Sequence, residues 1–360
     1  MADSRSITAL IMAGGTGGHV YPALALAGAL TKRGHKVHWL GTARGIESKL
    51  VPAANYTLHE LDIGGVRGHG WNTKLRAPAR IGKAILQAAK VIRNIEPQVV
   101  IGLGGFAAGP GGVAAKLLGK PLVIHEQNAR AGTTNKLLAR VASRVLTAYP
   151  NALPDAQCIG NPVRREIELL PVPAERFANR SGAARLLVLG GSLGAAAINA
   201  VVPGALAQMT VELRPCVRHQ TGDKHLAQTQ ENYRMAQVDA QVLPFIDDMA
   251  EALAWADLVV CRAGALTVAE LAAAGVGAIL VPFPHAIDDH QTANAQFLAN
   301  AGAGIIKQQS ELTEHHLAAL LTNLSMDRGR LLAMAEAARS LAVTQSAERF
   351  ADICLELANG

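Results

Sequence analysis

Residues 14–19 read Gly-Gly-Thr-Gly-Gly-His, a glycine-rich loop that ends on a titratable side chain. An apolar run over 7–13 precedes the loop, and the stretch that opens at Tyr21 and Pro22 and runs to residue 30 is expected to form a helix. Glycines let the backbone approach a ligand closely, and a helix N-terminus offers unpaired N–H groups. The pattern predicts a phosphate site beside a possible general base, His19. The alternative is a tight turn with a capping histidine.

A second glycine loop, Gly-Gly-Ser-Leu-Gly-Ala at 190–195, follows the apolar run 185–189 and leads into a helical stretch. The hydroxyl of Ser192 can donate a hydrogen bond, and the helix start can bind a phosphate. A close-packed strand–helix turn would give the same pattern.

The segment 264–270, Gly-Ala-Leu-Thr-Val-Ala-Glu, follows a third apolar run at 258–261. The carboxylate of Glu270 could bind both hydroxyls of a ribose, as the acidic residue of a dinucleotide fold does. The spacing from Thr267 to Glu270 also matches a capping box, and the residues alone slightly favour that reading.

Three further polar groups follow apolar runs or mark a junction. The sequence His-Glu-Gln-Asn at 125–128 is typical of the lip of a site, although ordinary loop polarity would also explain it. Arg164 follows Asn161-Pro162 and could reach a diphosphate or be a solvated linker charge. The cluster at 285–291 favours hydrogen bonds to a polyol over a metal, because the chain contains no Asp-x-Asp motif. No metal site is expected.

The elements that must position these residues alternate between short apolar runs and helical patterns. Half of the 360 residues are hydrophobic and 17% are charged, which predicts an α/β protein of two domains. Strands are expected near 7–13, 36–40, 57–61, 99–103, 121–125, 144–147, 185–189, 216–220, 241–244, 258–261, 278–281 and 303–306. We therefore expect two doubly wound, parallel-sheet (Rossmann-like) domains facing a shared cleft. The expected divisions are 1–163, 164–342 and a C-terminal helix at 343–360 that packs back towards the first domain.

The net charge of +6 favours acidic partners. Between residues 63 and 95 there is no acidic residue, but there are seven basic ones: Arg67, Lys74, Arg76, Arg80, Lys83, Lys90 and Arg93. On a helix from about residue 77, the basic residues 80, 83 and 90 would share a face opposite Ile81, Ile85 and Ile92. Such a stripe suits an anionic membrane surface, and a merely solvated face is equally favoured. The longest apolar stretch, 271–283, is broken by glycine and proline and does not predict a membrane span.

Taken together and in this order, the motifs resemble the MurG-type family of bacterial cell-wall synthesis, in glycosyltransferase family 28. The motifs that carry the resemblance are GGTGGH at 14–19, GLGGF at 102–106, HEQN at 125–128, GNPVR at 160–164, GGS at 190–192, FIDDM at 245–249, GALTVAE at 264–270 and DDHQ at 288–291. The resemblance implies a GT-B fold and inverting transfer of N-acetylglucosamine from UDP-GlcNAc to the C4 hydroxyl of undecaprenyl-pyrophosphoryl-MurNAc-pentapeptide (lipid I), which makes lipid II. It implies no cofactor and a peripheral place on the cytoplasmic face of the inner membrane.

The resemblance also implies roles for single residues. In the donor site, Ile246 would contact uracil through its backbone and Glu270 the ribose, while Gln291 and Asn128 would hold sugar hydroxyls. The diphosphate and nearby groups would contact Ser192, Arg164, Ala265, Leu266, Thr267, Val268, Ala269 and Glu270. Thr16, Gly17, Gly18 and the base His19 would face the reacting centre, and Gly104 and Gly105 the acceptor diphosphate. Leu193 departs from the glutamine that many family members carry there.

Three other functions remain open on the residues alone. An NAD-dependent dehydrogenase is suggested by the match of 102–107 to GxGxxA with Glu126 about 20 residues on, although Pro110 should delay the following helix. A non-enzymatic sugar-nucleotide sensor would keep the same pocket without turnover. Nucleic-acid binding is disfavoured, because the few aromatic residues do not alternate with basic ones.

Overall fold

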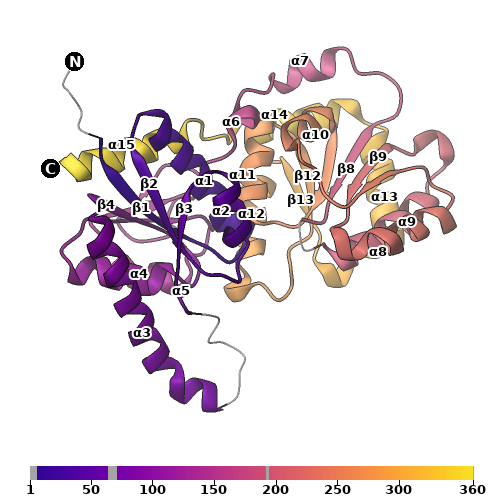
Figure 1. The fold of residues 1–360 in the computed structure, drawn as a ribbon. Helices are drawn as coiled ribbons and strands as arrows, with labels where there is room; N and C mark the ends of the chain where they lie inside the picture. Colours follow the sequence, from indigo (N-terminus) through magenta and orange to yellow (C-terminus); the bar gives the residue numbers. More distant parts are fainter. Residues whose placement is uncertain (1–5, 64–70, 192–193, 360) are drawn as a thin grey trace. The chain divides into compact units, whose positions relative to one another are not determined.

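The computed structural model describes residues 6–63, 71–191 and 194–359, with the backbone only at 71–77 and 287. The chain divides into two compact units (Figure 1). Unit 1 comprises residues 1–163 and 345–360, and unit 2 comprises residues 164–344.

Unit 1 is a parallel sheet in the order β3-β2-β1-β4-β5-β6-β7. Its strands are β1 (Thr8–Ala13), β2 (Lys36–Gly41), β3 (Thr57–Glu60), β4 (Val99–Gly104), β5 (Leu122–Glu126), β6 (Arg144–Thr147) and β7 (Gln157–Cys158). Its helices are α1 (Gly17–Lys32), α2 (Glu47–Ala53), α3 (Trp71–Ile95), α4 (Ala108–Leu117), α5 (Thr133–Leu138) and α15 (Ser346–Asn359).

Helices cover both faces of this sheet. Leu26 of α1 and Phe350 of α15 pack with Ile11 and Ile101 on one face. On the other face, α3 and α4 pack against residues of the same strands, such as Leu10 and Val100. Strands buried on both faces must be apolar at every position, which is why they appear in the sequence as continuous apolar runs.

Unit 2 is a second parallel sheet, in the order β10-β9-β8-β11-β12-β13. Its strands are β8 (Arg185–Leu189), β9 (Cys216–Gln220), β10 (Gln241–Leu243), β11 (Leu258–Cys261), β12 (Gly277–Leu280) and β13 (Gly304–Ile306). Its α-helices are α6 (Arg165–Glu168), α7 (Pro173–Ala178), α8 (Ala196–Ala207), α9 (Leu226–Met235), α10 (Met249–Trp255), α11 (Ala265–Ala274), α12 (His290–Ala299), α13 (Glu314–Ser325) and α14 (Arg328–Ser340). Short 3₁₀ turns are η1 (Val211–Leu213), η2 (Asp223–His225), η3 (Ile287–Asp289) and η4 (Gln309–Glu311).

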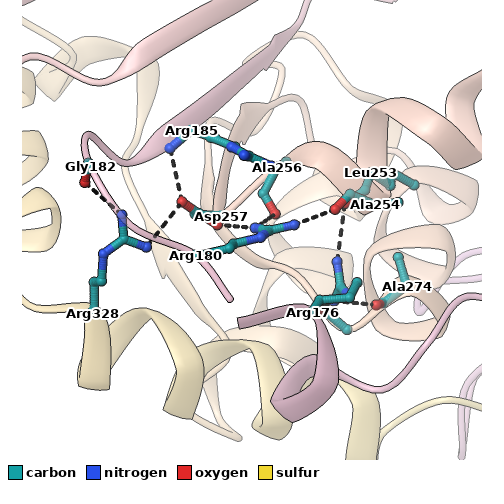
Figure 2. Close-up of polar contacts among 11 residues, drawn as sticks. Arg176, Arg180, Gly182, Arg185, Leu253, Ala254, Ala256, Asp257, Ala274 and Arg328 are labelled. Atoms are coloured by element: carbon teal, nitrogen blue, oxygen red, sulfur yellow. Dashed lines mark hydrogen bonds and ion pairs between the residues drawn. The ribbon is translucent and has the colours of Figure 1, made fainter. Parts of the chain in front are cut away.

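Arginines join the first segment of unit 2 to the C-terminal ends of its helices (Figure 2). Arg176 donates to the carbonyl oxygens of Leu253, at 3.2 Å, and Ala274, at 2.7 Å. Arg180 pairs with the buried Asp257, whose other oxygen accepts the backbone N–H of Arg185 at 3.0 Å. Cations suit helix C-termini because the last carbonyl groups have no partner within the helix.

The expected strands are confirmed, but several element boundaries differ from the expectation. β7 was missed because it has two exposed residues and no apolar pattern. Helix α1 begins at Gly17 rather than at Tyr21, with Pro22 inside it, so His19 lies in its first turn. Helix α4 begins at Ala108 and accommodates Pro110 in its first turn, where a missing N–H costs nothing, so the expected delay was wrong.

The basic segment forms α3, which starts at Trp71. Arg80, Lys83 and Lys90 are exposed, and Ile92 is buried, but Ile81 is 40% exposed and does not belong to the buried face. Nζ of Lys83 lies 2.6 Å from Oδ2 of Asp62, which directly precedes the segment 63–95 that contains no acidic residue. Arg67 lies outside the described residues. Across the part of the chain that the structure describes, no helix is both long enough and apolar enough to cross a membrane.

Candidate functional site

In each sheet, successive strands are added first on one side of the first strand and then on its other side, and the glycine loops lie at these two points. In unit 1 the order of the strands switches sides between β1 and β4, and in unit 2 between β8 and β11. Ligands of doubly wound proteins bind outside the carboxyl ends of the strands at such switch points. The loops that leave β1, β4, β8 and β11 are the ones the sequence singled out.

In unit 1 the loops after β1 and β4 pack closely. A Cβ atom at Gly105, whose φ is +85°, would lie 2.4 Å from the carbonyl oxygen of Gly14. The register of β4 against β1 shifts between Met12 and Ala13, which lie opposite Gly102 and Gly104. An irregularity of this kind turns the end of a strand. The two loops can therefore approach this closely only because Gly105 carries no side chain.

His19 stands where these loops meet. A Cβ atom at Gly104 would lie 2.7–3.2 Å from three atoms of the imidazole ring, so the absence of a side chain there makes room for the ring. The ring nitrogen Nδ1 lies 2.9 Å from Oε1 of Gln127, which follows β5. The structure thus brings residues 16–19, 104–105 and 127 together.

Glu47, at the start of α2, holds the glycine loop and was not found from the sequence. Its carboxylate is fully buried and accepts the N–H of Gly15 at 2.9 Å and both the N–H and the hydroxyl of Thr42, at 3.0 and 2.8 Å. Gly14 approaches the same side chain so closely that a Cβ atom there would lie 2.4 Å from Oε1. The only sequence signal is an acidic residue after the end of the neighbouring strand β2.

The segment 125–128 makes hydrogen bonds that support its own part of unit 1. Oε1 of Glu126 accepts the N–H and the side-chain amide of Asn128, at 3.0 and 3.1 Å. Oε2 accepts the N–H of Gly132 at 3.0 Å and the amide of Asn135 at 2.9 Å. Glu126 therefore fixes the loop that carries Asn128.

In unit 2 the loop 190–195 lies between β8 and α8. Gly190 packs against the end of β9, since a Cβ atom there would lie 2.8 Å from the carbonyl oxygen of Gln220. Asn199 of α8 donates to the carbonyl oxygen of Thr221 at 3.0 Å and accepts from the buried ring of His219 at 3.0 Å. Ser192 and Leu193, which the sequence singled out, lie outside the described residues.

Glu270 faces Arg164, not its own helix start. Helix α11 has Gly264 as its N-cap, without a side-chain cap, so the capping-box reading was wrong. A carboxylate oxygen of Glu270 lies 3.5 Å from Nη1 of Arg164, and the glutamate is 8% exposed. Burial raises the pKa of Glu270 to about 7, and the Arg164 charge opposes that rise. A buried carboxylate beside a cation is suited to accept hydrogen bonds from hydroxyl groups.

Three further groups of candidate donor-site residues follow the strands β10, β11 and β12 at the same edge of the sheet in unit 2. Ile246 is buried just before α10, and Ala265, Leu266, Thr267, Val268 and Ala269 form the first turns of α11. Gln291, in the first turn of α12, accepts the N–H of Phe283 at 2.9 Å. Arg262 donates to the carbonyl oxygens of Val281 and Pro282, both at 3.2 Å, and so holds the start of that loop. Among the described residues, no three His, Cys, Asp or Glu side chains are grouped to hold a metal ion.

Two family models match the chain. The glycosyltransferase family 28 N-terminal domain matches residues 9–147, and the C-terminal domain of the same family matches residues 185–353. Together they cover most of both units.

Curated relatives match over the whole length. Proteins of Marinobacter nauticus (54% identical, covering 100% of both chains) and Cellvibrio japonicus (55% identical, covering 99% of this chain and 100% of the relative) share one name. That name is UDP-N-acetylglucosamine–N-acetylmuramyl-(pentapeptide) pyrophosphoryl-undecaprenol N-acetylglucosamine transferase.

Solved structures share the fold. The crystal structure of MurG from Acinetobacter baumannii has a TM-score of 0.85 at 44% identity and covers 97% of this chain and 99% of its own. The calicheamicin glycosyltransferase CalG4, at 17% identity and a TM-score of 0.68, covers 99% of both chains and shares the fold alone.

Proposed function

The chain belongs to glycosyltransferase family 28, and we propose that it transfers N-acetylglucosamine from UDP-GlcNAc to lipid-linked muramyl-pentapeptide. The observation that carries the proposal is identity of 52–55% over essentially the full chain to relatives named for that reaction. The product would be the disaccharide-bearing lipid of peptidoglycan synthesis.

Unit 2 would hold the donor. The first turn of α11 offers backbone N–H groups and the positive end of its dipole to a diphosphate, beside the guanidinium of Arg164. Glu270 would accept the ribose hydroxyls, Ile246 would contact the uracil, and Gln291 would hold a sugar hydroxyl. Asn128 and Ser192 keep the roles that the family resemblance implies for them.

Unit 1 would bind the acceptor and carry the base. In an inverting transfer the acceptor hydroxyl attacks the anomeric carbon, and the bond from that carbon to the diphosphate oxygen breaks with its electron pair. The hydroxyl proton would pass to the imidazole of His19, and negative charge would grow on UDP, where N–H groups and Arg164 can stabilise it. Thr16, Gly17 and Gly18 would face this centre, and Gly104 and Gly105 the acceptor diphosphate.

The structure argues against the NAD-dependent dehydrogenase, because Glu126 is not free to bind a ribose. Both oxygens of Glu126 accept hydrogen bonds, from the loop that follows it and from Asn135 of α5, and the side chain is buried, so this carboxylate has no face for a ribose. Glu126 therefore acts as a structural residue.

A transfer assay tests the proposed function. Labelled N-acetylglucosamine should pass from its UDP donor to a short-chain analogue of the muramyl-pentapeptide lipid, and EDTA should leave the rate unchanged. The EDTA result is expected because the chain lacks Asp-x-Asp and offers helix starts and Arg164 for the leaving group. Loss of transfer in EDTA would return the 285–291 cluster to consideration as a metal site, and UDP-sugar binding without any transfer would favour the sensor.

We further propose that unit 1 docks on the cytoplasmic membrane surface through α3. The proposal rests on exposed Arg80 and Lys90 along a helix that carries no acidic residue. Lys83 contributes less, because Asp62 already neutralises it.

Reversing Arg80 and Lys90 to Glu should weaken binding to phosphatidylglycerol vesicles by roughly 30-fold or more, since each charge near the surface contributes ~1 kcal/mol. Vesicle co-sedimentation measures this. The matched control reverses the exposed Arg330 and Arg349, which lowers the formal net charge by the same four, from +6 to +2. Equal binding of both variants would leave α3 with a solvated basic face only.

A further inference from the structure

A chain of hydrogen bonds in unit 1 connects His19 to a buried backbone carbonyl. Oε1 of Gln127 lies 2.9 Å from Nδ1 of His19, and Nε2 of Gln127 lies 3.1 Å from Nδ1 of His125. Nε2 of His125 lies 2.9 Å from the carbonyl oxygen of Gly160. The family motifs explain His19 and the neighbouring Asn128, but they give Gln127 no task.

A backbone carbonyl group, which can only accept hydrogen bonds, determines the orientation of the Gln127 amide. Nε2 of Gln127 also lies 3.1 Å from the backbone carbonyl oxygen of His125, which can only accept. The NH₂ end must therefore point at His125, because the reverse orientation would place two oxygens face to face. The carbonyl oxygen of the amide consequently points at His19.

The hydrogen bonds of His125, at the other end of this series, are consistent with the same orientation of the Gln127 amide. Nε2 of His125 faces the Gly160 carbonyl and must carry a proton, so Nδ1 of a neutral ring is left to accept from Gln127. Burial lowers the pKa of His125 to about 4, which keeps this ring neutral at working pH. Phe350 stacks on the His125 ring at 5.3 Å between ring centroids, and Asn161 donates to the Gln127 backbone carbonyl at 3.1 Å. These two contacts hold the hydrogen-bonded residues in place.

We infer that Gln127 is a positioning residue that holds His19 in one tautomer, with the proton on Nδ1 and the lone pair on Nε2. A carbonyl oxygen only accepts, so Nδ1 of His19 must donate to it. The lone pair on Nε2 is then the one available to take a proton from a hydroxyl group. This deepens the proposed function and rests on it, because only a base needs a fixed lone pair.

Nitrogen-15 NMR of the full chain, labelled in its histidine rings, tests the tautomer without any substrate. The His19 signals are those missing from the His19→Ala spectrum. At a pH where this ring is neutral, the wild type should show Nδ1 protonated and Nε2 unprotonated. The opposite assignment in the wild type overturns the inference, whether or not any variant folds.

The catalytic consequence is tested with Gln127→Leu, which removes the acceptor at similar volume. The His19 proton should move toward Nε2, and kcat should fall ~10–10²-fold, as for other residues that orient a reactive side chain, with KM for UDP-GlcNAc nearly unchanged. Gln98→Leu is the matched control, because Gln98 bonds only to backbone at the start of β1 and at Glu96 among the described contacts. A moved proton with unchanged kcat overturns the positioning role. If the wild type shows no transfer, the proposed function fails, while the NMR result still decides the tautomer.

Discussion

Replacing His19 by alanine should lower turnover by ~10²–10⁴-fold while UDP-GlcNAc still binds with near-normal affinity. The loss is expected because the acceptor hydroxyl would then have to lose its proton to water. Binding should persist because most of the residues proposed for the donor, Asn128 excepted, belong to unit 2, whereas His19 lies in the first turn of α1 in unit 1. Single-turnover kinetics measures the first quantity and titration calorimetry the second.

The matched control is His315→Ala, on an exposed position of α13. It should leave both turnover and binding unchanged. Normal turnover of the His19 variant would show that His19 is not the base. It would also mean that Gln127 has no role in positioning a catalytic base. A joint loss of turnover and donor binding would instead indicate that the substitution disturbs the glycine loop 14–19, because the His19 ring packs closely against Gly104 at the end of β4.

The strands were predictable because buried parallel strands leave a direct trace in the sequence. The run over 185–189 is apolar at nearly every position, and β8 occupies the same residues. The start of α1 was not predictable in the same way. Pro22 is a usual sign of a helix start, but here it lies inside a helix that begins at Gly17, and this shift places His19 at the helix N-terminus.

The supporting contacts of the site could not be predicted from the sequence. Glu47 reaches the N–H of Gly15 across 32 positions, and Gln127 reaches His19 across 108. Such contacts exist only once the sheet has assembled in the order β2-β1-β4-β5. A lone glutamate or glutamine has no local pattern that reveals its partner. The same holds for Glu270, where the local spacing indicated a capping box while the actual partner is Arg164.

Replacing Asp257 by alanine should lower the free energy of unfolding of unit 2 by ~3–5 kcal/mol, the usual cost of leaving a buried charge without its partner. Asp257 is 1% exposed and its partner Arg180 is 7% exposed, so water cannot replace the lost carboxylate (Figure 2). Arg328, whose Nη1 lies 3.8 Å from the same carboxylate, would lose its counter-charge too. For a unit of this size the melting temperature should fall by roughly 10 °C, which calorimetry can measure.

Two comparisons separate lost charge from lost packing in this network. Asp257→Asn keeps an acceptor for the N–H of Arg185, so its melting temperature should lie between those of the wild type and the alanine variant. Glu231→Ala breaks the exposed pair with Arg234 on α9 and should cause no measurable shift. An alanine variant at Asp257 as stable as the wild type would mean that the carbonyl groups at the C-terminal end of α10 satisfy Arg180 by themselves. The helix C-termini, rather than the carboxylate, would then hold the 173–182 segment in place.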